Sequence, residues 1–97
     1  MNIPTWRLKP VPVLIRCDIK QGMDDGELVV QFTIDDTNYV SFVPEHFVDR
    51  EQSSLRAVIV ADYENSWLVD IPTETLTSGR RLRVPKEEQE TVVRTYL

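Results

Sequence analysis

The 97-residue chain has a net charge of −5, with 41% apolar and 28% charged residues. This length suits one domain with one core. The composition is ordinary for a soluble globular protein and excludes a disordered chain, which would be poorer in Val, Ile and aromatic residues. Because no apolar run approaches the roughly 20 residues that a membrane-spanning helix needs, no membrane partner is expected.

Cys17 is the single cysteine, so neither an intramolecular disulfide nor a zinc site made of cysteines can form within this sequence. Small secreted domains often carry paired cysteines, which favours an intracellular, reducing compartment. Residues 1–7 also lack the apolar segment of a signal peptide. We therefore expect a cytoplasmic protein.

The charges are unevenly distributed along the chain. Residues 18–74 contain thirteen acids and three bases, whereas four of the five bases in residues 75–97 lie between Arg80 and Lys86. An acidic middle repels phosphate backbones, which disfavours general nucleic-acid binding.

Apolar and polar residues alternate along residues 11–20 and 27–35. This period of two predicts half-buried strands of an antiparallel sheet. Residues 35–38 predict a hairpin turn into a third strand at 39–43, which Pro44 ends because proline donates no ladder hydrogen bond. One helical turn is expected over residues 44–48, with proline at its first position.

Residues 55–61 form the least alternating segment, with apolar residues on both faces toward its middle. Such a strand is usually central in a sheet, or lies where a barrel sheet folds over on itself. Further strands are expected at 67–71 and 80–84. From Pro85 the chain has the pattern of a helix start, with proline first and acids in the first turn, and we expect a short helix that runs through Arg94 and ends with the chain.

These elements predict a mostly β protein, a small antiparallel β-barrel with a short C-terminal helical segment. An SH3-like barrel is preferred and an OB-like barrel is the alternative. Residues 1–84 would form a single small β domain, and residues 85–97 a C-terminal helical or flexible tail. Phe42 and Phe47 are expected in the core. The other expected core residues are Val13, Ile15, Leu28, Val30, Phe32, Ile59 and Val69.

No catalytic or metal-binding constellation stands out. His46, the only histidine, follows Glu45, but no nucleophile motif of the G-x-S-x-G kind accompanies it, so a surface histidine on a helical turn is preferred. Cys17 alternates with core positions and is interpreted as a small core hydrophobe rather than a reactive thiol. The acidic turns flanking residues 27–35 would lie about 25 Å apart at the rise of a strand, and neither has calcium-loop spacing. We expect no enzymatic activity, metal or cofactor.

One compact basic cluster consists of Arg80, Arg81, Arg83 and Lys86. On a strand Arg81 and Arg83 share one face, and the neighbouring positions on that face, 79 and 85, carry no acid. The functional interpretation is contact with an anion or an acidic partner, which the guanidinium fork suits. The structural alternatives are a charge-protected edge strand and pairing with the acidic middle of the chain.

Two aromatic residues, Tyr63 and Trp67, flank a short polar turn, so at least one is expected near a rim, where it could join a peptide groove of the SH3 type. Core filling is the alternative for both. The resulting hypothesis is a non-enzymatic protein-interaction module or small subunit that binds another protein. Single-stranded nucleic-acid binding through the basic strand and nearby aromatics is the alternative. The candidate partner-binding residues are Arg80, Arg81, Arg83, Lys86, Tyr63 and Trp67.

Overall fold

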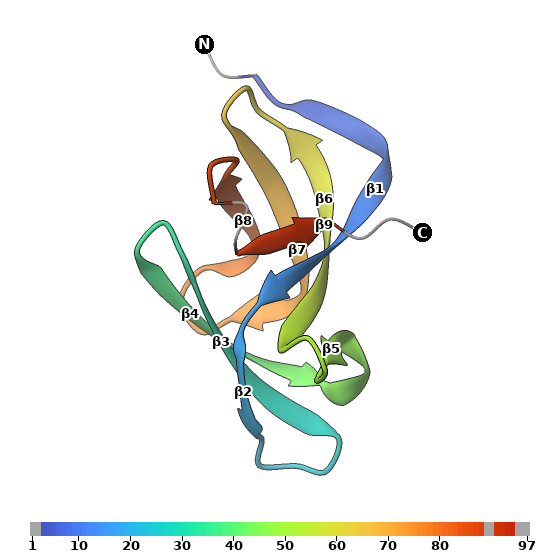
Figure 1. Ribbon diagram of the computed structural model, residues 1–97, viewed down its shortest axis with the longest axis vertical. Helices are drawn as coiled ribbons and strands as arrows, with labels where there is room; N and C mark the ends of the chain where they lie inside the picture. The colour runs from blue at the N-terminus through green and yellow to red at the C-terminus, as the bar shows by residue number, and fades with distance from the viewer. Residues whose placement is uncertain (1–2, 89–90, 95–97) are drawn as a thin grey trace.

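The computed structural model describes residues 3–88 and 91–94, and most of this part is strand (Figure 1). The strands are β1 (Thr5–Arg16), β2 (Asp18–Gln21), β3 (Glu27–Ile34), β4 (Thr37–Pro44), β5 (Val48–Asp49), β6 (Ser54–Asp62), β7 (Ser66–Thr75), β8 (Gly79–Pro85) and β9 (Val92–Arg94). A short 3₁₀ turn, η1 (Glu45–Phe47), precedes β5, as the sequence predicted. Across these residues no helix has the length and apolar character needed to cross a membrane.

The strands form one antiparallel sheet that curls into a half-barrel, which confirms the mostly β, antiparallel prediction (Figure 1). The strand order is β2-β3-β4-β7-β6-β1-β9, with β8 paired to β7 and β5 paired to β6. Only Cys17 separates β1 from β2 along the chain, although β2 lies at one end of this order and β1 near the other. At Cys17 the chain therefore passes between the two ends of the curled sheet.

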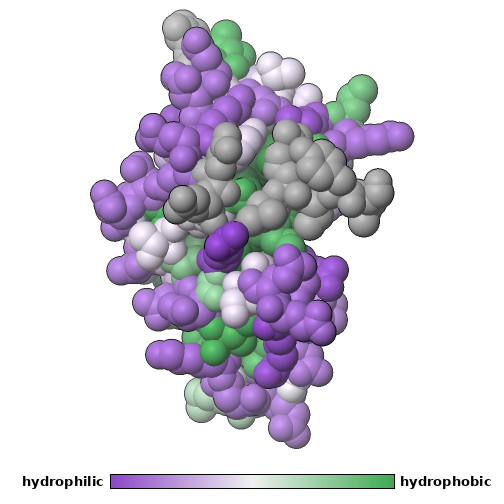
Figure 2. Space-filling view, in the orientation of Figure 1, coloured by the Kyte–Doolittle hydropathy of each residue, from purple (hydrophilic) through white to green (hydrophobic). Residues whose placement is uncertain are grey.

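The inner face of the curl holds the core, and all seven core residues listed from the sequence are buried there. Phe32 is 3% exposed and its ring stacks on Tyr39, with 5.5 Å between the ring centroids. Figure 2 shows mainly hydrophilic residues on the face seen in Figure 1, with hydrophobic residues visible between them. The expected burial of Phe42 is wrong: it is 39% exposed, because alternation along β4 turns Ser41 and Val43 inward instead.

Strand β1 begins at Thr5 rather than at residue 11, although the segment contains Pro10 and Pro12. Its pairing with β6 shifts between Trp6 and Val11, so Pro10 lies in a bulge. A bulge tolerates proline because the extra residues take no part in the ladder. The irregular register thus accommodates Pro10, whereas Pro12 pairs with Val58.

The C-terminal helix predicted from Pro85 is wrong over the described residues. Residues 85–88 end β8 and enter a turn, and residues 92–94 form β9, which pairs with Val13–Ile15 of β1. The β-branched Val92 fits a pleated strand, and its side chain is 2% exposed in the core. Residues 89–90 and 95–97 of the predicted helix lie outside the described part. The domain boundary at residue 84 stays a prediction.

Replacing Phe32 with alanine tests the position of the core. Phe32→Ala removes a buried ring from the inner face of β3 and should lower the free energy of unfolding by about 3–5 kcal/mol. The matched control is Phe42→Ala on the neighbouring strand, whose ring is 39% exposed, and it should cost less than about half as much. Urea denaturation followed by circular dichroism measures both, and equal losses would contradict this assignment of the inner face.

Candidate functional site

Strand β6 carries apolar side chains on both of its faces. Leu55, Ala57 and Ile59 point inward and are buried in the core. The alternate residues Val58 and Val60 point to the outer face of the sheet and are half-buried. The sequence pattern that placed this strand at the centre is confirmed, since β6 pairs with β1, β5 and β7. The outward residues Val58 and Val60 line a concave region together with Phe47 of η1.

A groove of about 480 Å³ lies on this outer face. The register aligns Pro12 of β1, Val58 of β6 and Asp70 of β7 in one row across three strands, and residues in such a row share a face. The outer groove is defined by its apolar lining residues Pro10, Pro12, Phe47, Val58, Val60 and Pro72, with Ala57 and Ile71 in its floor and with Arg56, Asp70 and Arg80 as its charged members.

Asp70 is already bound within the protein. Arg81 donates two hydrogen bonds to its carboxylate, Nε to Oδ1 at 2.7 Å and Nη2 to Oδ2 at 2.9 Å. The hydrogen bonds from Arg81 are the main cause that lowers the pKa of Asp70, and the charge of Arg80 contributes as well. The other two charged members of the outer groove, Arg56 and Arg80, form no ion pair with any described carboxylate.

Beside the outer groove, two arginines of β8 lie over aromatic rings. The guanidinium carbon of Arg81 is 5.2 Å from the ring centroid of Trp6, and that of Arg83 is 3.9 Å from the ring centroid of Tyr63. We call Trp6, Tyr63, Arg81 and Arg83 the aromatic–arginine patch. Cation–π contacts of this kind stabilise a surface modestly and fix the arginine side chains.

The structure separates the six residues that the sequence put forward for partner binding. Arg80 lines the outer groove, while Arg81, Arg83 and Tyr63 belong to the aromatic–arginine patch. Trp67 is 7% exposed and packs in the core.

Lys86, the sixth candidate, lies beside Asp62, with its Nζ 3.6 Å from Oδ1. Arg7 holds the same carboxylate, with Nε donating to Oδ2 at 2.6 Å. Burial alone would raise the pKa of Asp62, but the hydrogen bond and charge of Arg7 and the charge of Lys86 lower it. Two members of the basic cluster therefore pair with acids from the middle of the chain, as the structural alternative predicted: Arg81 with Asp70 and Lys86 with Asp62.

Sequence reasoning missed most of the outer groove. Pro10, Pro12 and Pro72 were treated only as strand breakers or left aside, although they provide rigid apolar surface. Phe47 was placed in the core and is only half-buried, packed against the core from η1. The signal that could have found the groove was the doubly apolar pattern of residues 55–61, which indicates apolar side chains on a second face of that strand.

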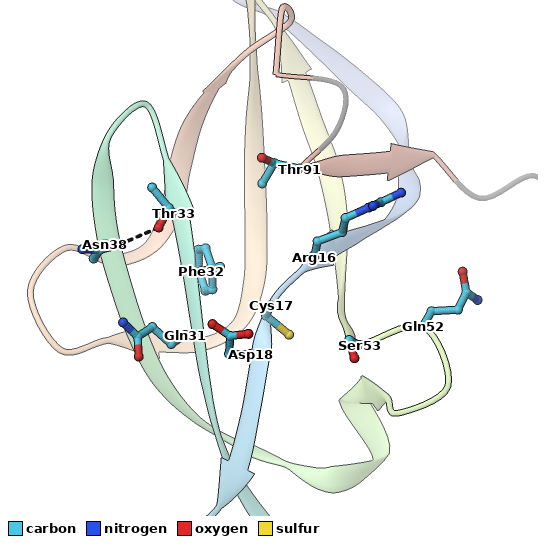
Figure 3. Close-up of a pocket in the computed structure, with 10 residues that line it drawn as sticks. All are labelled: Arg16, Cys17, Asp18, Gln31, Phe32, Thr33, Asn38, Gln52, Ser53 and Thr91. Atoms are coloured by element: carbon cyan, nitrogen blue, oxygen red, sulfur yellow. Dashed lines mark hydrogen bonds between the residues drawn. The ribbon is translucent and has the colours of Figure 1, made fainter.

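A second concave region, the polar cleft, lies where β1 passes into β2 (Figure 3). Its volume is about 550 Å³, and Cys17, Asp18 and Gln31 lie near one another at its centre. Burial, and to a lesser degree the charge of Asp18, raises the pKa of the Cys17 thiol to about 11. A thiol that stays protonated at neutral pH is a poor nucleophile, and Cys17 belongs to the buried core cluster, as predicted.

The remaining candidates for chemistry are dispersed. His46 is exposed on η1, and its ring contacts Phe47 at a centroid distance of 4.2 Å. Among residues 3–88 and 91–94, no three His, Cys, Asp or Glu side chains come together as metal ligands. The outer groove is therefore the candidate binding site.

No family model, curated protein or solved structure matches the chain.

Acid denaturation tests the Asp70–Arg81 pair. Because the pKa of Asp70 is lowered in the folded state, its stabilising contribution is present above the unfolded value of about 3.9 and is lost as the pH falls through the folded pKa. Arg81→Gln should therefore lower the melting temperature at pH 7, and this difference from the parent should shrink between pH 5 and pH 2.

The matched control for this experiment is Arg83→Gln. It removes the same charge from the same strand, but Arg83 forms no ion pair with a described carboxylate. Its melting temperature should follow that of the parent in parallel across the pH range. A pH-independent difference for Arg81→Gln would contradict the assigned pair.

Proposed function

We propose that this protein is a non-enzymatic interaction module that binds a segment of another protein in the outer groove. The observation that carries the proposal is the apolar outer face of β6, where the half-buried Val58 and Val60 line the groove together with prolines of β1 and β7. Contact with a partner would remove this apolar surface from water, which is the main favourable contribution to protein association. Contiguous exposed apolar surface with charged residues around it is typical of interaction sites.

The groove suits a protein segment better than a nucleic acid. Single-stranded nucleic acids bind when their bases stack on accessible aromatic side chains and their phosphates contact Lys and Arg side chains that have no other ion-pair partner. Here Arg81 and Arg83 already lie over the rings of Trp6 and Tyr63, and the net charge of −5 opposes a phosphate backbone. We therefore keep nucleic-acid binding as the alternative.

The SH3-like barrel type remains part of this proposal, with the OB-like type as its alternative. Both are small, strongly curled barrels, and the passage of the chain from β1 into β2 at Cys17 is compatible with either. A cytoplasmic location is likewise proposed, on the basis of the single cysteine.

Peptide selection tests the proposal. Peptides selected from a random displayed library against the immobilised protein should bind in the outer groove, and their affinities can be measured by fluorescence anisotropy. Val60→Asp places a carboxylate among the apolar lining residues and should weaken binding roughly 30-fold, which corresponds to about 2 kcal/mol for one buried valine side chain. The matched control is Leu76→Asp, since Leu76 is 64% exposed and lies outside the groove.

Val60→Thr provides a second variant that keeps the shape of the side chain and its β-branched backbone preference. It should weaken binding less than Val60→Asp does, and thermal melts establish that both variants are folded. Selected peptides that bind both folded variants as tightly as the parent would contradict the outer groove as the binding site.

A further inference from the structure

The charges of the outer groove indicate which segment it would hold, if the proposed function is correct. Both carboxylate oxygens of Asp70 accept hydrogen bonds from Arg81. Arg56 and Arg80 line the same groove and have no ion-pair partner among the described residues. The available charge in the groove is therefore positive, although the protein as a whole is negative.

The spacing of the apolar residues indicates the conformation of the bound segment. Val58 and Val60 are alternate residues of β6 that both line the outer groove, and the register of β6 against β7 shifts between Ile59 and Ala61. Alternate side chains of an extended peptide have the same repeat, so two of them can contact the two valines together. An extended peptide thus fits this face better than a helix, whose neighbouring side chains follow a different repeat.

We infer that the outer groove binds an extended segment of a partner protein in which alternate apolar side chains are accompanied by carboxylates. The apolar side chains contact Val58 and Val60, and the carboxylates pair with Arg56 and Arg80. Apolar contact is required because the net charge of −5 repels a purely acidic chain. Carboxylates are favoured because guanidinium groups bind them with two parallel hydrogen bonds.

The requirement for apolar side chains and carboxylates on one extended segment also distinguishes the partner from a second copy of the same chain. The acids of this protein are concentrated in residues 18–74, and the described strands of that segment are paired within the curled sheet. Over residues 3–88 and 91–94, a second copy would therefore present these acids on paired strands and the connections between them, not on an unpaired extended segment. Equilibrium sedimentation should accordingly show a monomer, and a dimer that Val60→Asp dissociates would overturn the inference.

Two matched synthetic peptides test the chemistry of the segment. One places two leucines at alternate positions between aspartates, and the other has asparagine in place of each aspartate. At 50 mM salt the aspartate peptide should bind the parent protein about three- to tenfold more tightly than its asparagine copy, as expected for two exposed ion pairs. The preference should decrease as salt is added, because exposed charge pairs are screened.

The double variant Arg56→Gln/Arg80→Gln should reduce this preference to less than twofold while leaving the affinity for the asparagine peptide unchanged. Lys20→Gln is the control, since it removes a positive charge on β2, away from the groove, and should retain the full preference. A preference that survives in the double variant would overturn the inference, and so would failure of both peptides to bind.

The outcomes separate this inference from the proposed function. If both peptides bind equally and Val60→Asp weakens both, the groove binds protein segments but does not select carboxylates. In that case the inference fails and the proposed function stands. If Val60→Asp affects neither peptide, the groove is not the binding site and both fail.

Discussion

The structure depends on β6, a strand that must place apolar side chains in two different environments. Its inward residues lie at the centre of the core, where Leu55 and Ile59 are fully buried. Its outward residues, Val58 and Val60, form part of the outer groove. An apolar outer face of a strand commonly packs against a further element or takes part in binding. The fold covers one face, and the proposed function explains the other.

The arginines of β8 show that the partner of a charged side chain can lie on a neighbouring strand and so cannot be identified from the pattern of its own strand. Along β8 itself, Arg81 has no acidic neighbour on its face, which suggested that it was free for a partner. The register places Asp70 of β7 directly opposite Arg81, and the two side chains form a bidentate pair. This pairing occupies the one acid of the outer groove and so determines the charge that remains there.

Much of the fold could be predicted from the sequence because strand patterns are local. The period-two alternation placed β3, the apolar run of residues 55–61 placed β6, and the core residues identified from the sequence include Phe32 and Val69. The errors came from contacts between distant segments. The segment that forms β9 has helix-start residues before it, yet it pairs with β1, more than seventy residues away, and buries Val92. Such pairing outweighs weak local helix preference. The outer groove was missed for the same reason, since β1, β6 and β7 meet only in the folded sheet.

The most direct test of the account is methyl NMR of the protein with labelled valine and leucine side chains, titrated with a peptide selected for binding. The account predicts that the methyl resonances of Val58 and Val60 shift and show intermolecular contacts with the apolar side chains of the peptide. The resonances of the buried Val30 and Val69 should remain in place. Intermolecular contacts that gather at the polar cleft around Cys17, with Val58 and Val60 unchanged, would contradict it.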